Sequence, residues 1–194
     1  MVNPGLAIAR STRAGKGTST VRVLETDRLI LRRVSTEDAG FILELVNEPS
    51  WVRFIGDRGI RTLDGARDYI SKMIVASYER FGFGLYLTEL KESGTPIGLC
   101  GLIKRDALED VDVGFAFFPR FWGNGYAHEA AAAVLALGKS AFGLDRIVAV
   151  TTIDNHSSIK ALEKLGFEFE RMVRLSEDAQ ELKLFARETS RLQP

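Results

Sequence analysis

The chain has 194 residues, and its 45% hydrophobic and 27% charged content is typical of one globular domain with a sizeable core, not of a disordered or fibrous protein. Lysine plus arginine and aspartate plus glutamate number 26 each, so the zero formal net charge gives no support for a nucleic-acid or membrane partner. The single cysteine, Cys100, excludes an intramolecular disulfide and favours a cytoplasmic protein. No apolar run approaches the roughly 18 residues of a membrane-spanning helix, and we expect no secretory signal.

The first twenty residues differ in composition from the rest of the chain. They are rich in Gly, Ser, Thr and Ala, and they carry Arg10, Arg13 and Lys16 but no acid. Such a segment buries too little apolar surface to fold, so we expect a flexible basic arm over residues 1–20 and one domain over residues 21–190. An organelle transit peptide, or an arm that grips an anionic partner, is a less favoured interpretation.

The first half of the domain should alternate between strand and helix. Residues 28–34 have the pattern of a strand, and the capping residues STED that follow begin a helix over residues 37–46. An irregular, glycine-containing stretch is expected over residues 47–61. Thr62 then caps a second helix that runs to about residue 80.

Beyond that helix the hydrophobic period changes to that of strands. Residues 85–90 and 96–103 predict a hairpin around a short loop with glycine, and an acidic turn leads into a further strand at 111–118. The later elements are expected to be a helix to about residue 141, a strand at 147–151, a short helix at 157–165 and closing strands at 167–175 and 182–186. The run IVAVT at 147–151 is apolar on both faces, which favours a central, parallel strand.

The stretch over residues 111–137 carries the first functional indication. It reads as a strand, a turn that contains Gly123 and Gly125, and an alanine-rich helix. Backbone N–H groups at the start of such a helix lack partners, and the helix dipole favours an anion there, so the turn predicts a phosphate or pyrophosphate site. A tight turn without a ligand explains the glycines equally well at this point.

Two common nucleotide-binding motifs do not fit this turn. A dinucleotide-binding turn needs a third glycine where His128 stands, and an acid after the next strand, where Thr152 stands. A P-loop needs Gly-Lys-Ser/Thr at its end, which is absent. Four expected strands and two helices also precede the turn, whereas a dinucleotide-binding domain opens with it.

Three segments in their order and spacing resemble a known family. PRFWGNGYAHEAA at 119–131 and NHSS with LEKLGF at 155–167 resemble the GNAT N-acetyltransferase superfamily, and ETDRLILR at 25–32 resembles its ribosomal-protein N-terminal (alanine/serine) acetyltransferase-like branch. The resemblance covers about residues 24–187. It implies an α/β (α+β) fold: a central, mixed, mostly antiparallel sheet of six to seven strands, splayed into a V, with about four helices.

The resemblance implies acetyl-CoA as cosubstrate. Trp122 stands where the family usually has Arg or Gln, but main-chain amides carry most of the phosphate binding. The backbone of residues 114–118 would pair with the pantetheine arm, and Asn155 would bind that arm from the other side. The residues that the resemblance assigns to acetyl-CoA are Phe115, Phe117, Trp122, Gly123, Asn124, Gly125, Tyr126, Ala127, Asn155 and Ser158.

The resemblance also implies the catalytic residues. Many relatives use a tyrosine as the acid, but Leu162 stands at that position, so Ser158 is the expected hydrogen-bond donor to the leaving thiolate. Asp112 is the expected base. Two plainer interpretations stay open: Ser158 packs or caps a helix turn, and Asp112 is a strand residue that faces solvent.

Other side chains have simpler expected roles. Trp51, Phe54 and Arg58 fall in the segment that shapes the acceptor pocket in this family, although core packing explains Trp51 and Phe54 equally well. His128 is expected to face water, and Glu129 to stabilise the start of its helix. Cys100 should be a buried, inert thiol, and two histidines with one cysteine indicate no metal site.

The function predicted from this resemblance is an acetyl-CoA-dependent N-acetyltransferase. The acceptor would be a primary amine on a small molecule, a peptide or a protein N-terminus, and it would attack the thioester directly in a ternary complex. A homodimer is compatible with this prediction. The alternative is a catalytically silent acyl-CoA-binding or regulatory module on the same fold, because the usual tyrosine is missing.

Overall fold

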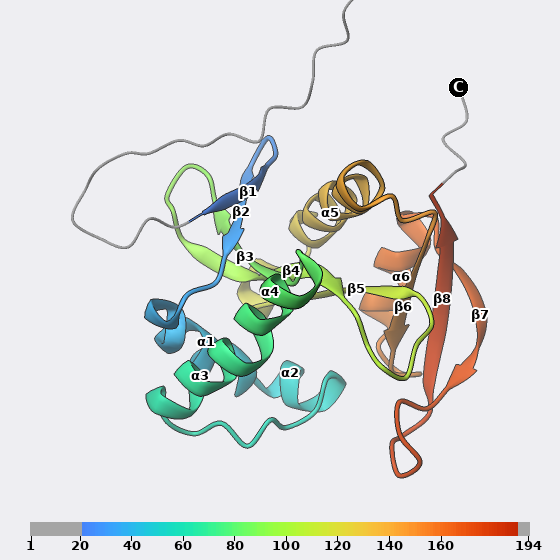
Figure 1. Cartoon of the computed structure of the whole chain (residues 1–194), viewed down its shortest axis with the longest axis horizontal. Helices are drawn as coiled ribbons and strands as arrows, with labels where there is room; N and C mark the ends of the chain where they lie inside the picture. The colour runs from blue at the N-terminus through green and yellow to red at the C-terminus, as the bar shows by residue number, and fades with distance from the viewer. Residues whose placement is uncertain (1–20, 190–194) are drawn as a thin grey trace, which may run out of the picture.

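The computed structural model describes residues 21–189, so the expected arm at residues 1–20 lies outside the described part of the chain. The described part forms one sheet of eight strands in the order β1-β2-β3-β4-β5-β6-β8-β7 (Figure 1). The strands are β1 Arg22–Glu25, β2 Leu29–Arg33, β3 Leu85–Leu90, β4 Pro96–Ile103, β5 Val111–Phe117, β6 Arg146–Thr151, β7 Glu168–Val173 and β8 Leu182–Glu188. The mixed, mostly antiparallel sheet is confirmed. It has one strand more than expected, because β1 pairs with β2.

The pairing between β5 and β6 sets the shape of the sheet. These two strands run parallel, and they pair only at Val111 with Ile147 and at Asp112 with Val148. All other neighbouring strands pair antiparallel, including β6 with β8. The IVAVT strand is therefore central but parallel on one side only. Beyond Asp112, the edge of β5 that faces β6 has no strand partner among residues 21–189, and this gap is the V-shaped opening that the family resemblance implies.

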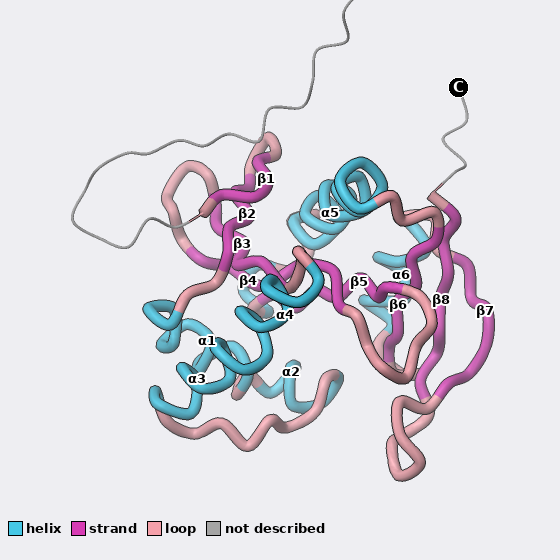
Figure 2. Tube along the Cα trace, in the orientation of Figure 1, coloured by secondary structure: helices cyan, strands magenta, loops and turns pink. Residues whose placement is uncertain are grey.

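The helices surround this opening. After a 3₁₀ turn at Thr36–Asp38, the chain forms α1 Ala39–Val46, α2 Pro49–Phe54, α3 Leu63–Tyr69, the π-helical segment η2 Ile70–Val75, α4 Ala76–Phe81, the 3₁₀ turn η3 Pro119–Phe121, α5 Tyr126–Phe142 and α6 His156–Lys164. Because α3, η2 and α4 are continuous, the described residues contain five helices. Helix α5 packs against β2, β4 and β5, whereas α1 to α4 gather together away from it (Figures 1 and 2).

Helix α2 corrects the expectation of an irregular stretch. Pro49 occupies its first turn, where the fixed φ angle of proline suits a helix start and the missing N–H costs nothing. The helix buries Trp51, which is 5% exposed. One turn and a half is too short to produce a recognisable hydrophobic period, so the sequence pattern does not predict it.

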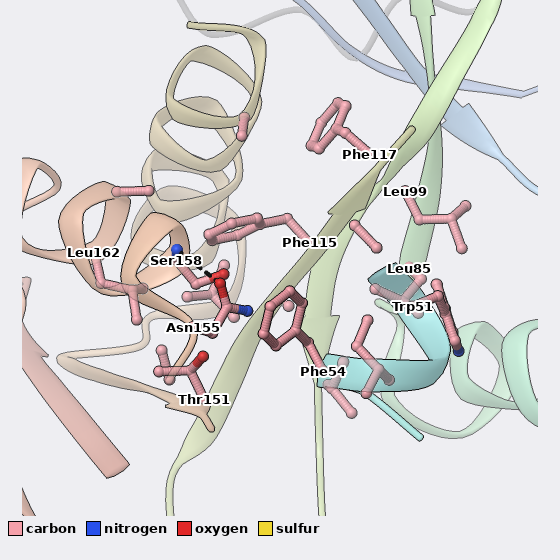
Figure 3. A pocket seen from close by; sticks show the side chains of 18 of the residues that line it. Trp51, Phe54, Leu85, Leu99, Phe115, Phe117, Thr151, Asn155, Ser158 and Leu162 are labelled. Carbon is pink, nitrogen blue, oxygen red and sulfur yellow. Dashed lines mark hydrogen bonds between the residues drawn. The ribbon is translucent and has the colours of Figure 1, made fainter. Parts of the chain in front are cut away.

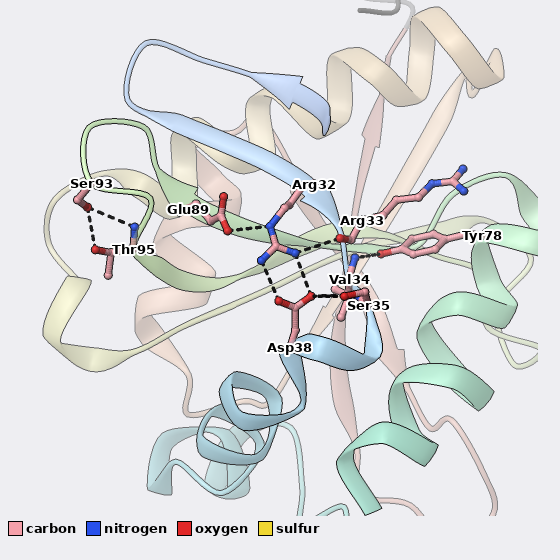
Figure 4. Close-up of polar contacts among 9 residues, drawn as sticks. All are labelled: Arg32, Arg33, Val34, Ser35, Asp38, Tyr78, Glu89, Ser93 and Thr95. Carbon is pink, nitrogen blue, oxygen red and sulfur yellow. Dashed lines mark hydrogen bonds and ion pairs between the residues drawn. The ribbon is translucent and has the colours of Figure 1, made fainter. Parts of the chain in front are cut away.

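A polar network joins the first strands to the helices. The Arg32 guanidinium on β2 donates to Glu89 Oε1 on β3 (2.7 Å) and to both carboxylate oxygens of Asp38 (2.8 and 2.9 Å). Tyr78 of α4 accepts a hydrogen bond from the Val34 N–H (3.1 Å) and donates to the Leu85 carbonyl. Figure 4 shows the contacts of Arg32 and the hydrogen bond between Val34 and Tyr78 at the end of β2. They hold the α1–α4 group against the sheet and thereby fix one wall of the opening.

A smaller apolar cluster contains Leu108, Val148, Val173 and Leu184, and the main hydrophobic core lies between this sheet and the helices. Cys100 is fully buried within it on β4, and burial raises the pKa of its thiol. A buried thiol with a raised pKa is unreactive, as expected for Cys100.

Candidate active site

A cavity of about 580 Å³ occupies the opening between β5 and β6. On one side its walls come from β5, from α2 and from the long helix that α3, η2 and α4 form together. On the other side they come from the start of α5 and from α6. Figure 3 shows Phe115 of β5 pointing toward the start of α6, while Phe54 of α2 reaches across toward Asn155. The cavity therefore brings together segments more than 100 positions apart in the chain.

The glycine turn forms one end of the cavity. Gly123 and Gly125 both have φ +79°, a left-handed conformation that other residues adopt only with strain, and Gly125 is the N-cap of α5. The first N–H group in α5 that bonds within the helix is that of Glu129, to the Gly125 carbonyl. The preceding amides of the first turn are therefore available to an anion, at a place where Gly125, Tyr126, Ala127 and His128 line the cavity.

The predicted residues of this turn divide into those that line the cavity and one that supports it. Trp122 and Gly123 line it, and the Trp122 indole also donates to the Phe117 carbonyl (2.7 Å), which ties the turn to the end of β5. Asn124 is absent from the lining. Its carbonyl instead accepts a hydrogen bond from Arg28 (3.0 Å).

Glu129 has the structural role expected of it. Its carboxylate accepts hydrogen bonds from Thr26 and Arg28 at the turn before β2. Burial opposes ionisation of Glu129, but these hydrogen bonds outweigh it and lower the pKa of the carboxyl group. His128 is exposed, as expected, but it also lines the cavity.

The start of α6 forms the wall opposite β5. The Asn155 side chain accepts a hydrogen bond from the Ser158 N–H (3.2 Å) and so caps α6 (Figure 3). Its carbonyl oxygen is thereby occupied, while its amide N–H groups stay available to a ligand. Ser158 is half-buried, and its hydroxyl makes no hydrogen bond within residues 21–189. Leu162, one turn further along, is buried and lines the cavity.

Asp112 lies where β5 and β6 separate. Its side chain is 2% exposed, lines the cavity and accepts a hydrogen bond from Arg105 Nε (2.5 Å). Burial is the strongest influence and raises the pKa of Asp112 to about 6, although Arg105 and a hydrogen bond from the Val150 backbone act in the opposite direction. The open alternative, a strand residue that faces solvent, is therefore wrong. A carboxyl group with this pKa is suited to accept a proton near neutral pH.

The remaining wall is apolar and aromatic, with cationic groups. Trp51, Phe54 and Arg58, all predicted for the acceptor pocket, line the cavity, as do Tyr69 and Met73 of the long helix. The Trp51 indole nitrogen is buried and has no hydrogen-bond partner in the described part of the chain. Trp51 therefore belongs both to the core and to the cavity wall, so the two interpretations of this residue are compatible.

Arg105 and Tyr69 are cavity residues that the sequence pattern does not predict. Arg105 follows β4, and the pairing of Ile103 with Asp112 places it close to the carboxylate. The antiparallel register of β4 with β5 is the signal that would predict the contact between Arg105 and Asp112, but reading it requires the exact length of the hairpin. Helical periodicity places Tyr69 on the inward face of its helix, but it does not show that Tyr69 lines a cavity there. Tyr69 stands directly before the π-helical segment η2.

A family model described as an acetyltransferase (GNAT) domain matches residues 28–168. The chain belongs to the GNAT acetyltransferase family. The match includes the glycine turn, Asp112 and the start of α6, and every residue that lines the cavity lies within it.

Individual relatives agree with this assignment. The uncharacterized N-acetyltransferase YoaA of Bacillus subtilis (strain 168) is 32% identical over 154 residues, which cover 78% of this chain and 86% of the relative. An acetyltransferase structure from Agrobacterium tumefaciens str. C58 has a TM-score of 0.72 at 21% identity and covers 91% of this chain and 98% of that one. RimL, a ribosomal L7/L12 alpha-N-protein acetyltransferase in complex with coenzyme A, has a TM-score of 0.74 at 16% identity, with 86% and 97% covered.

Two structural features are absent from residues 21–189 of this GNAT protein. No helix in that part is long and apolar enough to cross a membrane. No group of three or more His, Cys, Asp or Glu side chains there is arranged to hold a metal ion.

Proposed function

We propose that the protein transfers an acetyl group from acetyl-CoA to a primary amine. One observation carries the proposal: a single cavity joins the unpartnered amides at the start of α5, the open edge of β5 and the buried carboxylate of Asp112. The first suits a pyrophosphate, the second suits an extended amide-containing chain, and the third suits removal of a proton from an amine. The CoA bound in the RimL structure supports acetyl-CoA as the donor.

The donor-binding residues would act at two places. The amides of residues 123–127 would hold the pyrophosphate, with Trp122 fixing the turn to β5. Further along, the β5 backbone at Gly114, Phe115 and Phe117 would pair with the pantetheine arm, because no described strand occupies that edge beyond Asp112. Asn155 would bind the arm from the side of α6 through its amide N–H groups.

The chemical step needs a base and a donor to the leaving group. Asp112 would take a proton from the acceptor amine, directly or through a water, so that the neutral amine attacks the thioester carbonyl. The amine nitrogen forms the new bond to the acetyl carbon as the bond from that carbon to sulfur breaks. Ser158 would donate a hydrogen bond to the departing thiolate, which then takes its proton from solvent.

The acceptor is an amine of a small molecule, a peptide or a protein. RimL is described as an alpha-N-protein acetyltransferase of ribosomal L7/L12, which supports a protein or peptide N-terminus. The depth at which Asp112 is buried requires an acceptor that presents its amine on a narrow chain, and both classes meet that requirement.

The alternative function is an acyl-CoA-binding module without turnover. Leu162 favours it, because this buried side chain occupies the position where many relatives have a tyrosine and cannot donate a proton. Two residues of α6, Ser157 and Ser158, carry hydroxyl groups and line the cavity near that position. Of these, Ser158 is the one expected to replace the tyrosine.

Two measurements separate these functions. Calorimetric titration with acetyl-CoA tests the donor site, and absence of binding at protein concentrations on the order of tens of micromolar would contradict both proposals. Release of free thiol is then followed across a panel of amines and peptides. Turnover on any acceptor supports the transferase, whereas binding without turnover on every acceptor supports the silent module. Gly125→Trp, which fills the turn, is the control that should abolish binding.

A further inference from the structure

The charges at the acceptor end of the cavity are unevenly distributed. Among the described residues that line the cavity, Asp112 is the one carboxylate, and it is already paired with Arg105. Arg58, which follows α2, lines the same cavity and forms no ion pair with any described residue. The acceptor end therefore carries two guanidinium groups against one carboxylate.

Both arginines line the cavity together with Tyr69. Burial raises the pKa of the Tyr69 phenol, while Arg58 and Arg105 both oppose that rise electrostatically, so both guanidinium groups lie within electrostatic range of one hydroxyl. Arg105 is 29% exposed and uses its Nε for Asp112. Its terminal nitrogens donate no hydrogen bond within residues 21–189, which leaves them available to a ligand.

The surroundings of the two arginines are apolar. Trp51, Phe54 and Met73 line the cavity beside them, and they offer apolar surface rather than hydrogen-bond acceptors. A guanidinium group prefers a carboxylate, because its parallel N–H groups match the two oxygens. The described residues supply no acid for Arg58, so a carboxylate on the acceptor would complete the pair.

We propose that the acceptor is an amine that carries a carboxylate on an apolar scaffold, with the carboxylate bound by Arg58 and the terminal nitrogens of Arg105. The inference rests on the proposed transferase function and names its substrate class. The carboxylate would anchor at the mouth while the amine points inward to Asp112. Two arginines also disfavour an ammonium ion there, and the neutral amine is the form that attacks the thioester.

The carboxylate could be the α-carboxylate of an amino acid or an acidic side chain near a peptide N-terminus. Matched pairs test both sources: phenylalanine against phenylalaninamide, and a peptide that begins Ser-Asp against one that begins Ser-Asn. The amine of phenylalaninamide is less basic and more often neutral, so intrinsic reactivity favours the amide. A preference for the acid is therefore a property of the enzyme.

Thiol release gives kcat/KM for each acceptor with the wild-type protein and with Arg58→Met, Arg58→Lys and Arg67→Met. We expect the acid of at least one pair to be preferred on the order of 10-fold, as for a charge-assisted hydrogen bond. Arg58→Met should remove the preference and Arg58→Lys restore part of it. Arg67→Met should retain it, because Arg67 is exposed, pairs with Asp64 and does not line the cavity. The pair that shows the preference identifies the source of the carboxylate.

Equal use of acid and amide in both pairs, or a preference that Arg58→Met leaves unchanged, would overturn the inference while the transferase function stands. If no acceptor releases thiol, the transferase function fails, and calorimetry of phenylalanine and phenylalaninamide with the CoA-saturated protein decides the inference. Tighter, Arg58-dependent binding of the acid supports it. Equal binding overturns it.

Discussion

Arg28 and Glu129, which are 101 positions apart, join the turn before β2 to the first turn of α5. Glu129 Oε2 accepts a hydrogen bond from Arg28 Nε (2.7 Å), and it lies 2.7 Å from Arg28 Nη2 in the same ion pair. Glu129 Oε1 accepts from the Arg28 backbone N–H (2.9 Å) and from the Thr26 hydroxyl (2.6 Å). The carboxylate is thus fully satisfied, and its negative charge is neutralised beside the proposed pyrophosphate site.

The same arginine also contacts the glycine turn. Arg28 Nη1 donates to the Asn124 carbonyl (3.0 Å), and the guanidinium carbon lies 4.7 Å from the centre of the Tyr126 ring. Arg28 does not line the cavity. It is therefore a positioning residue, which holds the turn from behind while the amides face the ligand.

Replacement of Arg28 should weaken the donor site selectively. Arg28→Met keeps most of the apolar stem but leaves Glu129 unneutralised, so we expect the Kd for CoA to rise about fivefold, as for a partly exposed ion pair worth about 1 kcal/mol. Turnover at saturating acetyl-CoA should change little. Calorimetry and a kcat-against-KM comparison check this, with Arg28→Lys expected to recover part of the affinity. An unchanged Kd in Arg28→Met would contradict the positioning role.

Replacement of Gly125 should weaken CoA binding because this residue caps the start of α5, and not only because of backbone strain. Gly125→Ala and Gly94→Ala each put a side chain at a positive φ (+79° and +69°) without a steric clash, so both should lower stability by about 1 kcal/mol. Only Gly125→Ala alters the start of α5, and there we expect the Kd for CoA to rise on the order of 10-fold. Denaturant unfolding and calorimetry of both variants provide the comparison. Equal CoA affinity in the two variants would count against an anion site at this turn.

Replacement of Ser158 should lower turnover without weakening the binding of acetyl-CoA. Its hydroxyl has no partner within residues 21–189, so Ser158→Ala breaks no described hydrogen bond of that hydroxyl and leaves the backbone cap from Asn155 in place. We expect kcat to fall on the order of 10- to 100-fold because the thiolate loses its donor, while the Kd for acetyl-CoA stays within about twofold. Stopped thiol assays and calorimetry measure the two quantities. A loss of binding as large as the loss of turnover would show that Ser158 instead shapes the CoA site.

The ionisation of Asp112 should appear in the dependence of kcat/KM on pH. A base has to be ionised, and burial raises the pKa of Asp112 to about 6, so kcat/KM should rise with pH through that value and then level off. The acceptor's own amine adds a separate limb at higher pH. Asp112→Asn should lower activity and remove the limb near pH 6. A limb that persists in Asp112→Asn would assign the base to another group.

Ionisation of Asp112 should lower the stability of the fold as the pH rises, whereas it should increase activity over the same pH range. Because the folded-state pKa of Asp112 lies above its ordinary value of 3.8, folding favours the protonated form. The stabilisation is complete below about pH 4 and is lost as the pH rises through about 6. Denaturant unfolding of wild type and Asp112→Asn across this range measures it, and the asparagine variant should show the flatter dependence.

Local sequence patterns predict those helices and strands that are long enough to show a hydrophobic period or that end at a glycine. Gly143 caps the end of α5, and β3 and β4 flank a short turn that contains a glycine. Both features follow from their sequence signals. The short elements β1 and α2 are not predicted, because four and six residues carry too little periodicity. The residue roles at the site remain predictions, although the cavity contains all of the predicted site residues except Asn124.

The sequence by itself determined the family and the glycine turn, because these depend on residues that lie close together in the chain and on backbone angles that glycine alone adopts readily. Only the tertiary structure decided that Arg28 supports the turn, that Arg105 pairs with buried Asp112, and that Arg58 lines the cavity without an ion-pair partner among the described residues. These relationships depend on the register of β4 with β5 and on how β2, α2 and α5 pack around the sheet. No local sequence pattern encodes that packing.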